Sequence, residues 1–183
     1  MSSLAELLKQ ARGYAEFAMR KFGNVAPMMI AVMPKGPIHF VPDKLTDERA
    51  KDNFANTARL IATGYGATAA VMILESWMTL AGPDGNLPDM PPSESPDRME
   101  VVMLAAESFG EFETEILPIV RSDSGKFFGF GEPDARKLDQ LQGRFANLLP
   151  PEPVDDEMSL LARTLLQAMG IKAKNLKPKF GRN

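Results

Sequence analysis

The chain contains no cysteine and only one histidine, His39. Without thiols it can form neither disulfides nor a cysteine-based zinc or iron–sulfur site, and it has no thiolate nucleophile. A single imidazole also excludes histidine-rich metal sites and mechanisms that need two histidines. These absences remove many familiar catalytic and metal-binding classes, and we expect no cofactor.

The chain has neither a strong net charge nor a long apolar run. Its 21 basic and 24 acidic residues give a net charge of −3, which is too small to predict nucleic acid or an anionic membrane as the partner of the whole domain. The longest apolar stretch, residues 67–74, is far shorter than the roughly 20 residues that cross a bilayer. The first residues lack the apolar centre of a signal peptide, so we expect a cytoplasmic protein without membrane contact.

The composition is that of an ordinary globular protein. A chain of 183 residues that is 44% hydrophobic can form a sizeable core without disulfides or metals, so we expect a single domain over residues 1–170. Residues 171–183 form a basic tail whose ionisable side chains are all positive: Lys172, Lys174, Lys177, Lys179 and Arg182. Such a tail predicts at most weak contact with nucleic-acid phosphates.

Hydrophobic periodicity predicts the element order α-β-β-α-β-β-β-β-α-α. Helical spacing covers residues 4–22, 46–64, 134–149 and 155–169, whereas β-type segments cover residues 28–32, 38–41, 68–80, 99–106, 112–120 and 126–130. Helices and strands do not alternate singly, which favours an α+β fold over a parallel doubly wound one. We expect an antiparallel sheet of five or six strands, with an N-terminal helix, a middle helix and two C-terminal helices packed mainly on one face.

Two strands have informative patterns. Residues 68–80 are mostly apolar on both faces, which predicts a central strand. In residues 111–116, three glutamates, Glu111, Glu113 and Glu115, alternate with less polar residues. That alternation predicts one buried face and one acidic face in solvent.

Glycine-rich motifs do not indicate nucleotide binding. Residues 64–69 match G-x-G-x-x-A, but they lie between a predicted helix and a predicted strand. A dinucleotide site needs the reverse order, so we interpret these glycines as a helix end. Residues 124–127 lack the other residues of a phosphate-binding loop and fit a hairpin turn.

Glu75 is the most unusual carboxylate, because it shares a strand face with apolar residues. A buried carboxylate must be paired, hydrogen-bonded or protonated. The favoured interpretation is a structural bond to Arg98 or to backbone N–H groups of the following loop. The alternative is an oxygen-ligand metal site made of Glu75, Asp97 and Glu100, as in a metal-dependent hydrolase.

His39 is the other residue with catalytic potential, because its pKa range suits a general base. It lies on a short strand bounded by prolines, and no acidic residue within three positions could orient the ring. A structural role is therefore favoured.

The segment of residues 82–97 contains five prolines and no predicted element. Loops of this length are uncommon in compact domains and are often functional. We therefore place a partner-binding surface here, although an inert crossover is equally compatible with the pattern. Its residues would be Trp77, Asp89, Glu94, Asp97 and Arg98.

The residues from Glu75 to Glu107 carry a resemblance. Glu75–Met78, Pro92–Val102 and the pair Ala106–Glu107 resemble small uncharacterised proteins of bacterial genomes and prophages. The resemblance implies an accessory role in a bacterial or mobile-element setting.

Three hypotheses for function follow. The first is a non-enzymatic protein that acts by contact with a protein partner or with itself. The second is the metal-dependent hydrolase that would use Glu75, Asp97 and Glu100. The third is a nucleic-acid accessory protein that would use the basic tail.

Overall fold

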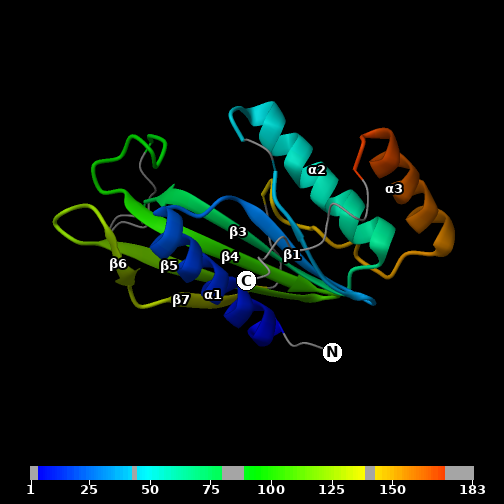
Figure 1. Ribbon diagram of the computed structural model, residues 1–183, viewed down its shortest axis with the longest axis horizontal. Coiled ribbons are helices and arrows are strands. Elements are labelled where there is room, and N and C mark those ends of the chain that lie inside the picture. The colour runs from blue at the N-terminus through cyan, green and yellow to red at the C-terminus, as the bar shows by residue number, and fades with distance from the viewer. Residues whose placement is uncertain (1–3, 43–44, 80–88, 139–142, 172–183) are drawn as a thin grey trace.

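The computed structural model describes residues 4–42, 45–79, 89–138 and 143–171 (Figure 1). Its helices are α1 (Leu4–Phe22), α2 (Glu48–Tyr65) and α3 (Asp156–Ala168). Its strands are β1 (Met28–Met33), β2 (Gly36–Phe40), β3 (Ala69–Met78), β4 (Met99–Ser108), β5 (Glu111–Arg121), β6 (Phe127–Phe130) and β7 (Asp134–Leu138). No helix in the described ranges is long and apolar enough to span a bilayer.

The strands form one antiparallel sheet. Six of them follow the order β2-β1-β3-β4-β5-β6, and β7 pairs with β5. The predicted α+β class with an antiparallel sheet is confirmed. As the two apolar faces of its sequence predicted, β3 lies inside the sheet, between β1 and β4.

Helices cover both faces of the sheet, so the prediction that they pack mainly on one face is wrong. The first core lies under α1 and joins Leu7 and Ala15 to Ile73 and Leu104. The second core joins Phe54 and Ile61 of α2 to Met72 of β3 and Leu166 of α3. Because β3 and β4 are apolar on both sides, each side needs its own cover. Figure 1 shows α3 beside α2, away from α1.

The predicted helix over residues 134–149 is also wrong, and the described ranges contain three helices where four were expected. Strand β6 pairs only with the end of β5, residues Ile119–Arg121. The earlier residues of β5, Phe112–Ile116, pair with β4 on one edge. Without β7, the backbone groups of their other edge would have no partner, and β7 pairs with that edge. Completing the ladder outweighs a local helical pattern, because buried backbone polar groups need partners.

The acidic face of β5 is not a solvent face throughout. Glu111 is exposed, but Glu115 is buried and forms an ion pair with Arg12 of α1. Helix α1 packs on this side of the sheet, and Leu117 of the same strand belongs to the core beneath the helix. The prediction of an acidic face in solvent therefore holds at Glu111 and is wrong at Glu115.

The glycine motif ends α2, as predicted, but Gly66 is the left-handed residue and the expected one, Gly64, lies within the helix. Gly66 adopts φ 66°, and its N–H donates to the carbonyls of Ala62 and Thr63. A left-handed residue at this position is the usual way to satisfy the last carbonyls of a helix. Strand β3 then begins at Ala69, so the motif lies between a helix and a strand and not at a phosphate-binding helix start.

Candidate functional site

The predicted carboxylate site lies where β3 ends and β4 begins, beneath the segment that leaves α1. A pocket of about 350 Å³ is lined there by Glu75, Ser76, Trp77, Glu100 and residues 24–27. The strand register places Trp77 opposite Glu100 and Glu75 opposite Val102, so the two carboxylates lie on the same face of the sheet.

Glu75 is half-buried, and its Oε2 accepts a hydrogen bond from the N–H of Val25 at 2.6 Å. The donor is a backbone N–H, as expected, but it lies in the segment after α1, and Arg98 instead contacts Trp77 and Ser93; residues 82–88 of the loop lie outside the described residues. The donor lies 50 positions away in sequence, in the segment after α1, and no local pattern could reveal it. Burial raises the pKa of Glu75, and nearby Glu100 raises it further, whereas the Val25 N–H and Arg121 oppose the shift.

Glu100 is already occupied by a cation. Its two oxygens accept hydrogen bonds from Nε and Nη2 of Arg121 at 2.6 and 2.5 Å. Asp97 does not line the pocket and lies exposed in a turn, where its N–H donates to Ser95 Oγ at 3.3 Å. The described residues contain no group of three or more side chains placed to hold a metal ion. Glu75 and Glu100 therefore line the same pocket, as the metal-site alternative requires, whereas Asp97 lies outside it.

The residues assigned to partner binding are all exposed, and Trp77 and Arg98 are in contact. Trp77 is 42% exposed, and the guanidinium of Arg98 lies over its ring at 4.6 Å from the centroid. Arg98 also donates to the carbonyl of Ser93, which ties it to the turn that precedes β4. Asp89, Glu94 and Asp97 are exposed. The first part of this loop, residues 80–88, lies outside the described residues.

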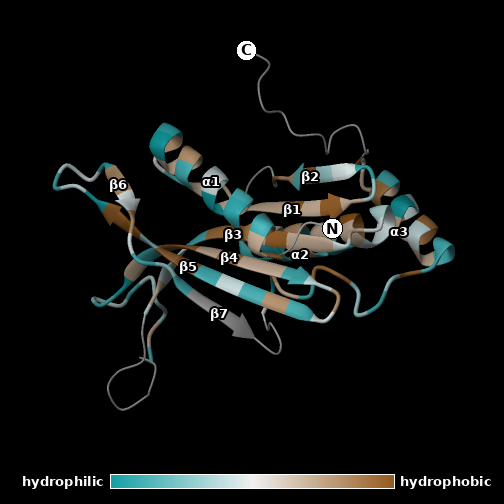
Figure 2. Cartoon of the chain, turned by 90° about the horizontal axis from the view of Figure 1, so that it is seen from below, coloured by the Kyte–Doolittle hydropathy of each residue, from teal (hydrophilic) through white to brown (hydrophobic). Residues whose placement is uncertain are grey.

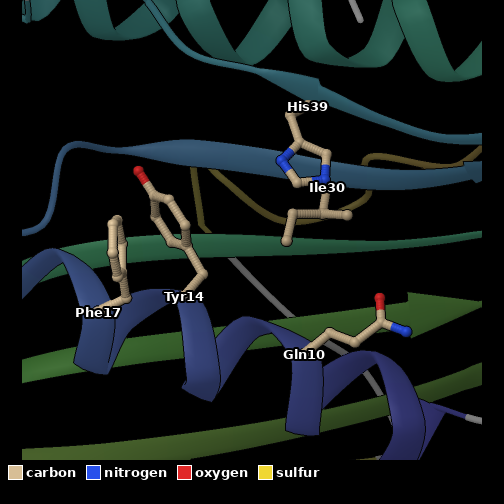
Figure 3. Close-up of a pocket in the computed structure, with 5 residues that line it drawn as sticks. All are labelled: Gln10, Tyr14, Phe17, Ile30 and His39. Carbon is tan, nitrogen blue, oxygen red and sulfur yellow. The ribbon is translucent and has the colours of Figure 1, made fainter. Parts of the chain in front are cut away.

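His39 lines a second pocket, of about 250 Å³, between α1 and the β1–β2 hairpin (Figure 3). Gln10, Tyr14 and Phe17 enter it from α1, and Ile30 enters it from β1. None of these residues is a carboxylate that could orient the imidazole for catalysis. Burial lowers the pKa of His39 and raises the pKa of Tyr14, so both side chains are uncharged at neutral pH.

We expect the imidazole of His39 to titrate below the ordinary pKa of 6.5. Because charging the ring is harder in the folded protein, the free energy of unfolding should fall as the pH drops from 6.5 through the lowered pKa. The ring protons of this single histidine can be followed directly by NMR. In His39→Gln the same part of the pH dependence should be missing; a midpoint at or above 6.5 would contradict the burial argument.

Among the described residues, the most buried carboxylate is one that the sequence pattern did not indicate. Glu107, at the end of β4, is 1% exposed, and its Oε1 accepts the N–H of Leu149 at 2.6 Å. Burial raises the pKa of Glu107, while the N–H groups of Leu149, Leu148 and Asn147 favour the charged form and oppose that shift. Asn147 has φ 52°, and the successive N–H groups of this segment favour a negative charge nearby, whereas Oε2 of Glu107 is buried without a hydrogen-bond partner.

Arg59 of α2 holds the same segment from the other side. Its Nη2 donates to the carbonyls of Arg144 and Ala146 at 2.6 and 2.9 Å, and its Nε donates to the carbonyl of Asn147 at 3.1 Å. The carbonyl groups of this segment therefore face the Arg59 guanidinium, and its N–H groups face the Glu107 carboxylate. Together, Arg59 and Glu107 fix residues 144–149, which have no regular structure of their own.

Helix α3 has the most exposed apolar surface of the described helices. Four side chains, which we call the α3 stripe, follow one another along it and are 45–53% exposed: Met158, Leu161, Leu165 and Met169. The apolar turns of α3 lie at one end of the molecule, beyond α2 (Figure 2). Comparison with protein-family models, curated proteins and solved structures finds no significant match.

Proposed function

We propose that this protein is non-enzymatic and acts by contact with proteins, and that the α3 stripe is its contact surface. The observation behind this proposal is the exposure of four large apolar side chains at the spacing of one helical face. Large exposed apolar patches on soluble proteins often mark sites of interaction with other proteins. An apolar helical face on a partner is the surface that would match the stripe.

The stripe belongs to a helix that is firmly held. At Gly64 of α2 an added Cβ would come within 3.2 Å of the backbone nitrogen of Arg163, so the two helices approach closely there. Arg163 Nη1 donates to the carbonyl of Gly64 at 3.0 Å, and Ser159 Oγ donates to that of Thr63 at 3.4 Å. These contacts fix the rotation of α3, so the exposed side chains are presented in a defined orientation.

The apolar arc of α3 is wider than the part that α2 covers. Ala162 and Leu166 are buried against the second core. At 100° per residue, Met158, Met169 and Leu165 continue the same arc on its uncovered side. A helix that only completed the fold would need polar residues at these positions. The uncovered half of the arc supports a role in binding.

The proposed role as an accessory protein also takes in the other predicted sites. The exposed surface of Trp77, Arg98 and the loop acids is a second contact surface. The hydrolase alternative has less support, because Glu100 is occupied by Arg121 and Asp97 lies apart. The basic tail, with its possible nucleic-acid contacts, lies outside the described residues. A cytoplasmic bacterial or mobile-element setting remains part of the proposal.

Site-specific photo-crosslinking in the native host tests the contact surface. A photoreactive amino acid is placed at Leu161, which is 53% exposed, and in a separate protein at Phe128 of β6, which is 73% exposed. Accessibility alone favours adducts at Phe128. We expect discrete protein adducts from position 161 and none from position 128, separated by gel and identified by mass spectrometry. Equal adducts from both positions, or none from 161, would overturn the proposal.

A further inference from the structure

We infer that the α3 stripe binds the α3 stripe of a second copy of this chain, with the two helices antiparallel about a two-fold axis. This inference rests on the proposed function and names the partner. Three features support it: the order of side chains along the stripe, the distribution of charge along α3, and the position of α3 in the fold.

The stripe is close to symmetric along the helix. Its order is Met, Leu, Leu, Met, at intervals of three, four and four residues. In a two-fold interface each patch faces a copy of itself, so the surface must be self-complementary. Antiparallel pairing places Leu161 opposite Leu165 of the other copy, and Met158 opposite its Met169. The two leucines then form the centre and the flexible methionines fill the ends.

The charges on α3 favour antiparallel pairing over parallel pairing. Asp155, Asp156 and Glu157 are gathered at the start of the helix, and its last turn has no basic residue. In a parallel pair these acidic ends would lie side by side and repel. In an antiparallel pair each acidic end lies beside the last turn of the other helix, residues 165–168, which carries no charged side chain. The helix dipoles are also opposed in this arrangement.

The place of α3 in the fold leaves room for a second copy. The helix lies beside α2 at one end of the molecule (Figures 1 and 2), and its inner side is taken up by Ala162, Leu166 and the bonds to residues 63–64. A single helix pair is a small interface, and small interfaces give weak complexes. We therefore expect a monomer–dimer equilibrium with a dissociation constant in the micromolar range.

Sedimentation equilibrium of the full-length protein across that concentration range measures the association. The wild type should shift from monomer to dimer, and Leu161→Glu and Leu165→Lys should each weaken association at least tenfold. Leu160→Glu is the matched control, because Leu160 is 59% exposed on the same helix but points about 100° away from Leu161. It should associate like the wild type, and circular dichroism should show that all variants are folded.

Mixing the two stripe variants tests the antiparallel register. In a mixed dimer the new carboxylate of Leu161→Glu faces the new ammonium of Leu165→Lys, and the remaining Leu161 and Leu165 face each other. The mixture should therefore dimerise more tightly than either variant alone. Dimerisation of the wild type without this rescue would overturn the antiparallel arrangement.

The outcomes separate this inference from the function it rests on. A wild type that stays monomeric throughout, with crosslinks from position 161 to a different protein, overturns the self-association and leaves the contact function standing. Absence of both dimer and crosslinks overturns both. Association of Leu161→Glu as tight as that of the wild type would show that the dimer uses another surface, and it also rejects the inference.

Discussion

Glu107→Ala is expected to lower the free energy of unfolding by about 3–5 kcal/mol, a large part of the 5–15 kcal/mol that stabilises a typical domain. The substitution removes the acceptor of the Leu149 N–H and leaves an empty space in a fully buried position. The nearby N–H groups of Leu148 and Asn147 also lose the anion that they face. Each buried donor left without an acceptor costs about 1–3 kcal/mol.

Urea denaturation followed by circular dichroism measures this change, and Glu107→Gln is the control. The amide keeps the shape of the side chain and one acceptor oxygen, so we expect a loss less than half as large as that in Glu107→Ala. Equal stability of Glu107→Ala and the wild type would mean that residues 147–149 do not depend on the carboxylate. The same curves recorded at several pH values give a second readout.

The pH dependence of that readout follows from the direction of the pKa shift. Burial raises the pKa of Glu107 above its ordinary value of 4.5, so the folded protein binds this proton more tightly than the unfolded chain does. The contribution of the group to stability is therefore full below pH 4.5 and is lost as the pH rises through the raised pKa. The stability of the wild type minus that of Glu107→Gln should decrease over this interval.

The sequence predicted the three described helices and six of the seven strands, but it assigned the segment of β7 to a helix, for reasons that particular segments illustrate. Strand β3 was recognisable because it is mostly apolar on both faces, which requires cover on each side. Residues 134–149 have apolar residues at helical spacing, but their structure depends on β5, whose first half pairs with β4 on one edge and would otherwise have no partner on the other. An unpaired strand edge elsewhere in the chain has no signature in the segment that completes it.

The carboxylates show the same limit. Glu75 stood out because its strand alternates regularly, yet its partner Val25 lies in another part of the chain. Glu107 has an equally strong reason to need a partner, but its position at the end of β4 resembles that of an exposed strand terminus. Its burial comes from residues 147–149, which pack over it from 42 positions away. The sequence therefore indicated a buried carboxylate only at Glu75, where a long alternating pattern surrounds it, and not at Glu107, which lies at the end of a strand.

Helix α3 illustrates a different limit. Its periodicity predicted an amphipathic helix over residues 155–169, and the structure has α3 at Asp156–Ala168. Periodicity gives the direction of the apolar face but not the width of the surface that will cover it. The stripe depends on the tertiary structure, because the fold buries Ala162 and Leu166 and leaves Leu161 and Leu165 exposed.

Arg59→Met is expected to lower the free energy of unfolding by about 2 kcal/mol, because it leaves the carbonyls of Arg144, Ala146 and Asn147 without their charged donor. Methionine retains much of the apolar stem, so the loss reports the guanidinium more than packing. Arg49→Met is the matched control on the same helix. Arg49 is exposed, and its replacement should change stability by less than about 0.5 kcal/mol.

The double variant Arg59→Met with Glu107→Gln shows whether the two side chains act as one clamp. Both hold residues 144–149, so once one is removed the segment should already be loosened and the second loss should be smaller. We expect the double variant to lose at least 0.5 kcal/mol less than the sum of the single losses, within the roughly 0.5–3 kcal/mol typical of coupled neighbours. Urea denaturation of the four proteins under one condition measures this difference. Strict additivity would mean that the cation and the anion fix separate parts of the segment, and that neither depends on the other.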